Sequence, residues 1–234
     1  MLVEMIALDN IIYMLIPLII VGLYYRSVTG DSREVVYATL RMVFQLVAVG
    51  FALIYIFEND SWYIGFFIIL FMITMSSFIA LRNLEDRNTT IYFIIFFAIA
   101  IAGTFNLVLV IKFALDKITF YEPRYVIPLA GMIYANSMNA ISIAAERLEK
   151  DIKNTTFKVA KVSAFKSSMI PKINTFLAVG IVSLPGMMTG QILSGVDPLV
   201  AVRYQIVVMA MIFGSAGMSV MIYLTLLGKI KYGK

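Results

Sequence analysis

The feature that most constrains this chain is a succession of apolar segments, each about as long as a helix that crosses a bilayer. Such a helix needs about 20 mostly apolar residues. Hydrophobic residues make up 61% of the 234 positions, whereas a soluble domain is about half apolar. We therefore predict an all-α integral membrane protein with one transmembrane domain, residues 1–234. Its seven expected spans are 7–25, 35–57, 62–81, 91–113, 125–145, 170–193 and 199–227.

The basic residues predict how these spans are oriented. Seven spans place 14 Lys and Arg residues on one side of the membrane and 4 on the other, with Arg41 inside a span. Since basic loops stay in the cytoplasm, we expect an N-terminus outside and a C-terminus inside the cell membrane. The basic side holds Arg26, Arg33, Arg82, Arg87, Arg147, Lys150, Lys153, Lys158, Lys161, Lys166, Lys172, Lys229, Lys231 and Lys234, and the other side holds Lys112, Lys117, Arg124 and Arg203.

The longest polar stretch lies between the fifth and sixth spans and predicts a short cytoplasmic helical hairpin. Glu146 with Lys150, and Glu149 with Lys153, have the i,i+4 spacing that supports a helix. The run Asn154-Thr155-Thr156 then breaks the helix and offers an N-cap for the next one. We expect both arms of the hairpin to continue into the membrane.

The tip of this hairpin is our candidate for contact with a cytoplasmic partner. Phe157 would pack into a groove of that partner, because buried aromatic groups dominate interfaces. A solvated linker that only joins two spans is the alternative. The residues of the expected contact are Asn154, Thr155, Thr156, Phe157 and Lys158.

The strongest local motif predicts a broken or kinked sixth helix. Proline removes a helix hydrogen bond, and glycine loosens the backbone beside it. Transporters use such breaks to expose backbone groups to a substrate, whereas a kink at the membrane surface is the other interpretation. The residues concerned are Ser183, Pro185, Gly186, Met187, Met188 and Gly190.

Two asparagines in the fifth span have two interpretations. Gly131, Ala135 and Asn139 share one helix face, and small residues with asparagine amides suit close helix packing. Alternatively, Asn136 or Asn139 faces a substrate pathway.

Arg41 and Gln45 lie one turn apart in the second span. An arginine among apolar residues usually faces protein or water. It can equally extend its guanidinium to the nearby interface.

Composition excludes several activities. Without cysteine or histidine, the chain has no disulfide, no Ser-His or Cys-His catalysis and no metal site of those ligands. The 15 methionines are spread over most segments and fit apolar packing better than Cu(I) binding. The net charge of +5 is explained by topology, so we expect lipid contacts and no nucleic acid. We expect neither a cofactor nor an enzymatic activity, and the identity of any metal is left open.

These segments resemble one family, the FetB-like (YbbM-like) ABC permeases. The resemblance rests on Arg41-x-x-x-Gln45-Leu46-x-x-x-Gly50, Val126-Ile127-Pro128-Leu-x-Gly131, Asn136-Ser137-Met138-Asn139-Ala140, Val182-Ser183-Leu184-Pro185-Gly186-Met187-Met188-Thr189-Gly190 and Ala201-Val202-Arg203-Tyr204-Gln205.

The resemblance implies a permease that dimerises and works with a separate cytoplasmic ATP-binding cassette subunit. Bacterial members are assigned to iron export, and plant members to aluminium tolerance and nucleotide-sugar transport. Members usually carry a longer loop between the fifth and sixth helices, with a glycine-containing turn that resembles a coupling element. Here no glycine occurs between Gly131 and Gly180. A channel or scaffold that works without an ATPase therefore stays open as an alternative.

Overall fold

The computed structural model describes residues 7–58, 61–82, 84–115 and 122–233. Among these residues all the regular elements are helices. They form two compact units, Met1–Asn59 and Asp60–Lys234, which are described separately. Of the basic residues counted above, Lys117 and Lys234 lie outside the described residues.

The first unit is a pair of helical spans. A short helix, α1 (Leu8–Ile11), and a 3-10 turn (Ile12–Met14) lead into α2 (Leu15–Thr29), which is followed by α3 (Arg33–Glu58). Gly30 ends α2 with φ +79°, a left-handed conformation that favours glycine. No residue of α2 or α3 is buried within the structure. Their apolar side chains are thus available to lipid or to another membrane helix.

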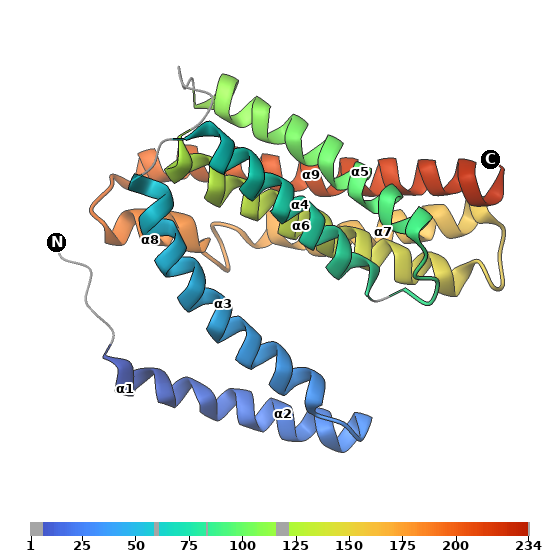
Figure 1. Cartoon of the computed structure of the whole chain (residues 1–234), viewed down its shortest axis with the longest axis horizontal. Helices are drawn as coiled ribbons and strands as arrows, with labels where there is room; N and C mark the ends of the chain where they lie inside the picture. Colours follow the sequence, from blue (N-terminus) through green and yellow to red (C-terminus); the bar gives the residue numbers. More distant parts are fainter. Residues whose placement is uncertain (1–6, 59–60, 83, 116–121, 234) are drawn as a thin grey trace. The chain divides into compact units, whose positions relative to one another are not determined.

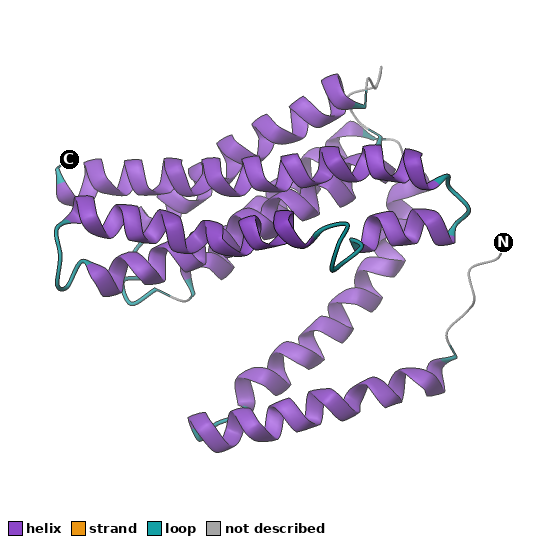
Figure 2. Cartoon of the chain, turned by 180° about the vertical axis from the view of Figure 1, so that it is seen from behind, coloured by secondary structure: helices purple, strands orange, loops and turns teal. Residues whose placement is uncertain are grey.

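The second unit is a helical bundle built on two central helices (Figures 1 and 2). Its elements are α4 (Trp62–Leu81), α5 (Thr89–Leu109) with a π-helical turn (Val110–Ala114), α6 (Pro123–Asp151), α7 (Phe157–Ala178), α8 (Gly186–Leu193) and α9 (Pro198–Tyr232). Helix α6 contacts α4, α5, α7 and α9, whereas α9 contacts α5, α6, α7 and α8. These two helices therefore form the axis around which the others pack.

Six of the described helical segments are long and apolar enough to cross a membrane. They coincide with six of the seven predicted spans, so the chain is a multi-pass membrane protein. The predicted sixth span, 170–193, is not among them, because it is divided between α7 and α8. The six segments are Asp9–Thr29, Arg33–Glu58, Trp62–Leu81, Thr89–Ala114, Pro123–Asp151 and Pro198–Tyr232.

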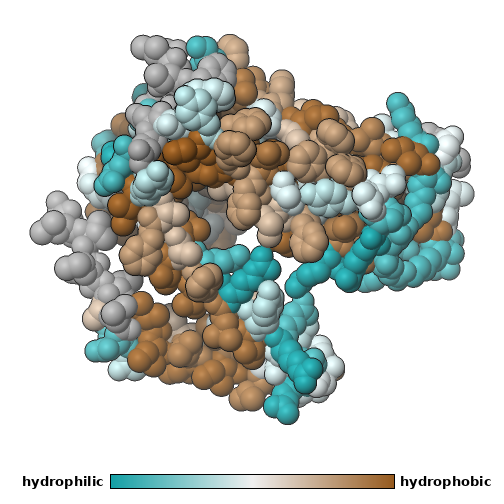
Figure 3. All heavy atoms as spheres, viewed as in Figure 1, coloured by the Kyte–Doolittle hydropathy of each residue, from teal (hydrophilic) through white to brown (hydrophobic). Residues whose placement is uncertain are grey.

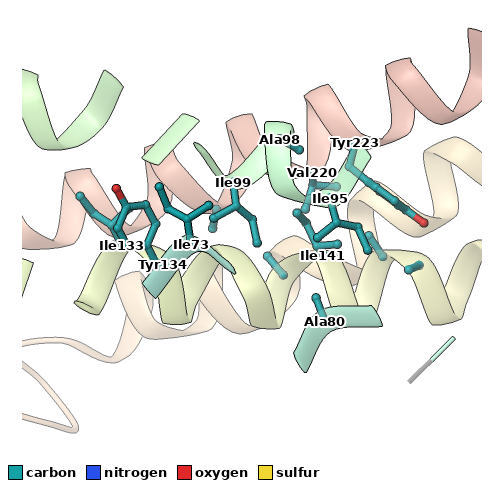
Figure 4. Packing of buried hydrophobic residues seen from close by; sticks show 14 of the residues in the cluster. Ile73, Ala80, Ile95, Ala98, Ile99, Ile133, Tyr134, Ile141, Val220 and Tyr223 are labelled. Atoms are coloured by element: carbon teal, nitrogen blue, oxygen red, sulfur yellow. The ribbon is translucent and has the colours of Figure 1, made fainter. Parts of the chain in front are cut away.

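Isoleucine, alanine and two tyrosines fill the centre of the bundle (Figure 4). The buried alanines have no exposed surface, which lets the helices approach closely. Among the glycines of the bundle, the tightest packing is at Gly103 of α5, where a methyl group would collide with the ring of Tyr134 on α6. The labelled core residues are Ile73, Ala80, Ile95, Ala98, Ile99, Ile133, Tyr134, Ile141, Val220 and Tyr223.

Apolar side chains also cover the outside of the bundle, as expected of helices that face lipid. Phe66 and Phe67 of α4, and Phe93 and Phe97 of α5, are each at least half exposed. Hydrophilic residues gather instead at the end that holds the α4–α5 loop, the α6–α7 turn and the C-terminus (Figure 3). Three segments that sequence analysis assigned to one side of the membrane thus meet at one end of the unit.

The α6–α7 hairpin forms as predicted, but only one of its two predicted i,i+4 ion pairs forms. Glu146 and Lys150 pair at 2.7 Å, which confirms the first. Lys153 instead pairs with Glu85 of the α4–α5 loop at 2.8 Å. The Glu149 carboxylate accepts the backbone N–H of Glu85 at 3.1 Å. A tertiary contact has replaced the local one, and it joins the hairpin to the loop.

The turn at the tip of the hairpin differs in detail from the predicted N-cap. Thr156 occupies the N-cap position of α7, but its side chain makes no capping hydrogen bond. The Thr155 hydroxyl donates to the Asp151 carbonyl at 2.8 Å and so closes the end of α6. Thr155 therefore closes the first arm, whereas Thr156 begins the second through its backbone, since its carbonyl accepts the N–H of Ala160 at 3.0 Å.

Candidate substrate pathway

A polar cavity of about 470 Å³ lies among α4, α6 and α7. Helix α6 packs against both α4 and α7 (Figure 1). The cavity is lined by Ile79, Arg82, Met138, Asn139, Ala140, Ser142, Ile143, Glu146, Pro171 and Lys172. Charged side chains line it from the end of α4, from α6 and from α7.

Asn136 and Lys172 form a polar contact beside this cavity. The Asn136 amide nitrogen donates to the Met132 carbonyl at 2.8 Å, one turn earlier in α6. This bond fixes the amide so that its Oδ1 accepts a hydrogen bond from the Lys172 ammonium on α7. The pair ties α6 and α7 together. The sequence alone indicates no role for Lys172 beyond its contribution to the charge asymmetry that predicts topology.

The position of Asn139 corrects one interpretation of α6. Ala135 and Asn139 are exposed, so the face that they share with Gly131 is not a packing face within this unit. The buried face of α6 instead carries Ile133, Ser137, Ala140, Ile141 and Ala144. Because Asn139 lines the polar cavity, its amide is available to a ligand.

The predicted sixth span is interrupted over residues 179–185, between α7 and α8. Helix α7 runs on through Pro171 to Ala178. The Ala178 carbonyl then accepts the N–H groups of Val182 and Ser183, at 2.8 and 3.2 Å. Gly180 lies inside the turn with φ +81°, where a side chain would be strained. Among the described residues, no backbone hydrogen bond links residues 178–183 to residues 184–193.

A second cavity, of about 440 Å³, lies between this break and α9. Pro185 and Met188 line it, opposite Met209 of α9. Gln205, which is 6% exposed, contributes a polar group to the apolar wall. Its Oε1 has no hydrogen-bond partner among the described residues. Gln205 lies within the family-like Ala201–Gln205 motif, but its burial could not be read from the sequence.

The other predicted pathway residues do not line either of these two cavities. Met187 lines a small space against α6 and α9. Ser183, Gly186 and Gly190 are exposed. Arg41 and Gln45 belong to the first unit, with Arg41 partly buried and Gln45 exposed.

The structure corrects the expected role of Phe157. Its ring is 7% exposed and stacks on Tyr232 near the end of α9, with centroids 4.7 Å apart. Because it belongs to the chain's own core, it cannot fill a groove of another protein. Asn154, Thr155 and Thr156 are exposed at the tip, as is Lys158 beyond them.

Ion pairs connect the three segments at this charged end. Lys231 of α9 pairs with Asp86 of the α4–α5 loop at 2.6 Å, beside the Lys153–Glu85 pair. The hydrogen bond from Lys231 holds the pKa of the Asp86 carboxyl below its ordinary value. The loop is therefore attached both to the hairpin and to the last helix.

No described group of three or more His, Cys, Asp or Glu side chains is placed to hold a metal ion. The polar cavity offers one amide, a hydroxyl and two basic groups, with Glu146 as its carboxylate. This set of ligands suits hydrogen bonding and charge pairing better than direct metal coordination.

Comparison with known proteins places the chain in a family. Residues 7–162 and 155–231 match UPF0014, described as an uncharacterised protein family. The chain is 32% identical to the probable iron export permease protein FetB of Escherichia coli over 83% of this chain and 80% of that protein. It is 31% identical to the protein ALUMINUM SENSITIVE 3 of Arabidopsis thaliana, over 88% and 80% of the two chains.

A third relative is the UPF0014 membrane protein slr1647 of Synechocystis, at 30% identity over 77% of this chain and 76% of that protein. No solved structure matches the chain. The extent of the family match, together with the apolar helices, establishes that this chain belongs to the UPF0014 family of membrane proteins.

Proposed function

We propose that the chain is the membrane-spanning permease subunit of an ABC-type exporter, which works with a separate cytoplasmic ATP-binding subunit and exports a metal such as iron. The observation that carries this proposal is the similarity to a probable iron export permease along most of both chains. Hydrolysis of ATP belongs to the partner, so this subunit has no catalytic residues of its own.

The proposed topology has seven spans, with the N-terminus outside and the C-terminus in the cytoplasm. The division of α7 from α8 is compatible with a broken sixth span, since irregular backbone is tolerated at membrane depth where it lines a cavity or packs in protein. The meeting of three basic segments at one end of the bundle supports the cytoplasmic assignment of that end. In this topology the whole chain is one permease domain.

The proposed pathway combines the polar cavity with the break between α7 and α8. Both lie along α7, so a movement of this helix changes the shape of both cavities. Transporter sites commonly use such discontinuous helices. Within the second unit the proposed pathway residues are Asn136, Asn139, Ser183, Pro185, Gly186, Met187, Met188 and Gly190. Arg41 and Gln45 of the first unit remain pathway candidates on the sequence alone.

The proposed docking site for the ATP-binding subunit is the exposed tip of the α6–α7 hairpin. Asn154, Thr155, Thr156 and Lys158 are accessible there. The Lys153–Glu85 ion pair adds the α4–α5 loop to the same rigid end. Since α6 and α7 also line the polar cavity, a displacement of the tip is transmitted to the proposed pathway. A second copy of the chain completes the transporter, as in the resembling family.

The decisive experiment is to replace residues 154–156 with Gly-Ser-Gly and to measure co-purification of a cassette ATPase and cellular iron content. We expect the variant to reach the membrane, to lose the ATPase and to accumulate iron. The matched control replaces Ser194 and Val196 with glycine and keeps Gly195, whose φ is +89°, in the α8–α9 turn at the other end of the bundle. Equal ATPase recovery from both variants would refute docking at the hairpin.

One observation favours a second candidate, a channel or scaffold of the same family that works without an ATPase. The family match is in two pieces that overlap at residues 155–162, in the hairpin. The turn also lacks glycine, unlike the coupling element that the resemblance implies. Metal or nucleotide-sugar release that persists in cells without any cassette partner would support this candidate.

A further inference from the structure

Lys172 carries a positive charge in a position where charge is costly. It is partly buried near the start of the segment predicted as the sixth span. Ionisable residues at such positions usually face a cavity and have a functional role. Within the described ranges, the only side-chain partner of its ammonium is the neutral Asn136 amide. An ammonium with a neutral partner leaves its charge uncompensated.

The other charges of the polar cavity do not supply that compensation. Glu146 is the one carboxylate in the lining, and it is paired with Lys150 at 2.7 Å. The Lys172 charge is therefore not balanced by the carboxylate of the lining and would repel a bare divalent cation.

The neutral groups in the lining extend the same preference. An ammonium has three N–H donors, and the Asn136 bond uses one of them. The Asn139 amide, which makes no side-chain hydrogen bond among the described residues, adds two more. Positive and N–H-donating groups together recognise the oxygens of carboxylates and phosphates.

We propose that this cavity is an anion site, in which Lys172 and the Asn139 amide receive carboxylate or phosphate oxygens of the cargo. The inference rests on the proposed export function and specifies its cargo class. A metal would leave the cell as an anionic complex rather than as a bare cation. A volume of about 470 Å³ has room for such a complex, since ligand pockets typically span about 300–1,000 Å³.

The test is direct binding, measured calorimetrically on the purified full chain in lipid nanodiscs. The probes are iron(III) citrate, uridine diphosphate and manganese(II) chloride. We expect Lys172→Gln to weaken binding of the anionic probe about tenfold or more, because a hydrogen bond to a charged group is lost. Lys172→Arg should retain most of the affinity, because the positive charge is kept.

Lys166→Gln is the matched control, since this exposed lysine lies on the same helix and does not line the cavity. Glutamine can still bond to the Asn136 amide, and circular dichroism would establish that the Lys172→Gln variant is folded. Binding of iron(III) citrate identifies carboxylate as the oxygen source, whereas binding of uridine diphosphate alone identifies phosphate.

Three results would overturn the inference. The first is that the chain binds manganese(II) in preference to both anions. The second is that the native chain and Lys172→Gln bind the anionic probe with equal affinity. The third is that no probe binds. The binding measurement uses no ATPase. If the chain proves to have no cassette partner, the proposed exporter function fails but the measured binding is unaffected. The two proposals can therefore fail independently.

Discussion

Replacement of Gly103 by alanine tests the packing between α5 and α6. A Cβ atom at this position would overlap the Tyr134 ring, lying 2.9 Å from its Cδ1 and 3.1 Å from Cγ2 of Ile133. Tyr134 is 1% exposed, so its ring is enclosed by the core. We therefore expect the added methyl group to force the two helices apart.

The magnitude follows from comparison with a second glycine. Overpacking of a core costs about 1–3 kcal/mol, whereas alanine is favoured over glycine in a helix by about 0.8–1.0 kcal/mol. At Gly131 of α6 a Cβ would meet only the Met72 side chain, at an ordinary 3.9 Å. The propensity gain applies to both helices, so Gly103→Ala should be less stable than Gly131→Ala by about 1–3 kcal/mol.

The assay is reversible unfolding of the purified variants in lipid bicelles, followed by circular dichroism during titration with a denaturing detergent. The double variant Gly103→Ala/Tyr134→Leu adds a test of mechanism. If the clash with the ring is the cause, the two effects should be less than additive, by about 0.5 kcal/mol or more. Equal stability of Gly103→Ala and Gly131→Ala would show that the helices are not in close contact.

Three further outcomes are expected. Gly186→Leu and Gly190→Leu should preserve membrane expression, since a Cβ atom at either position meets open space. Both variants should abolish transport, as measured by cellular metal content. Normal transport would show that the break is only a structural kink. A cysteine at Asn154 should react with impermeant reagents only from the cytoplasmic side, and labelling from outside would reverse the topology. Phe157→Ala should lower the free energy of unfolding by about 3–5 kcal/mol, because its ring is buried; a change as small as that of the 75% exposed Phe113→Ala would contradict this packing.

The sequence predicted the helical class and six of the spans because bilayer thickness fixes the length of an apolar helix. It also predicted the hairpin, since i,i+4 pairing is local. The Glu149–Lys153 pair failed for the opposite reason. Lys153 finds Glu85, which is 68 residues away in the chain, and no local rule identifies a partner brought close by folding.

The candidate site was only partly predictable for a related reason. Asn136 and Asn139 stood out because amides are unusual in an apolar segment. Lys172 did not, because a lysine beside a membrane segment is ordinarily explained by topology. Its significance comes from the Asn136 contact and the cavity, which depend on how α7 lies against α6. Phe157 was misassigned because an aromatic residue next to a polar turn resembles an interface residue until its own chain is seen to bury it.

The length of α9 has a consequence for movement along the proposed pathway. Its 35 residues correspond to ~52 Å at 1.5 Å per residue, which exceeds the ~30 Å hydrocarbon layer. Both α7 and α8 contact this one continuous helix. Because no described backbone hydrogen bond crosses from residues 178–183 to residues 184–193, the Leu184–Pro185 junction can serve as a hinge. Helix α7 or α8 can then slide against α9 while its own helical hydrogen bonds stay intact. The proposed pathway could thus open at one end without unfolding of the helix at the other end.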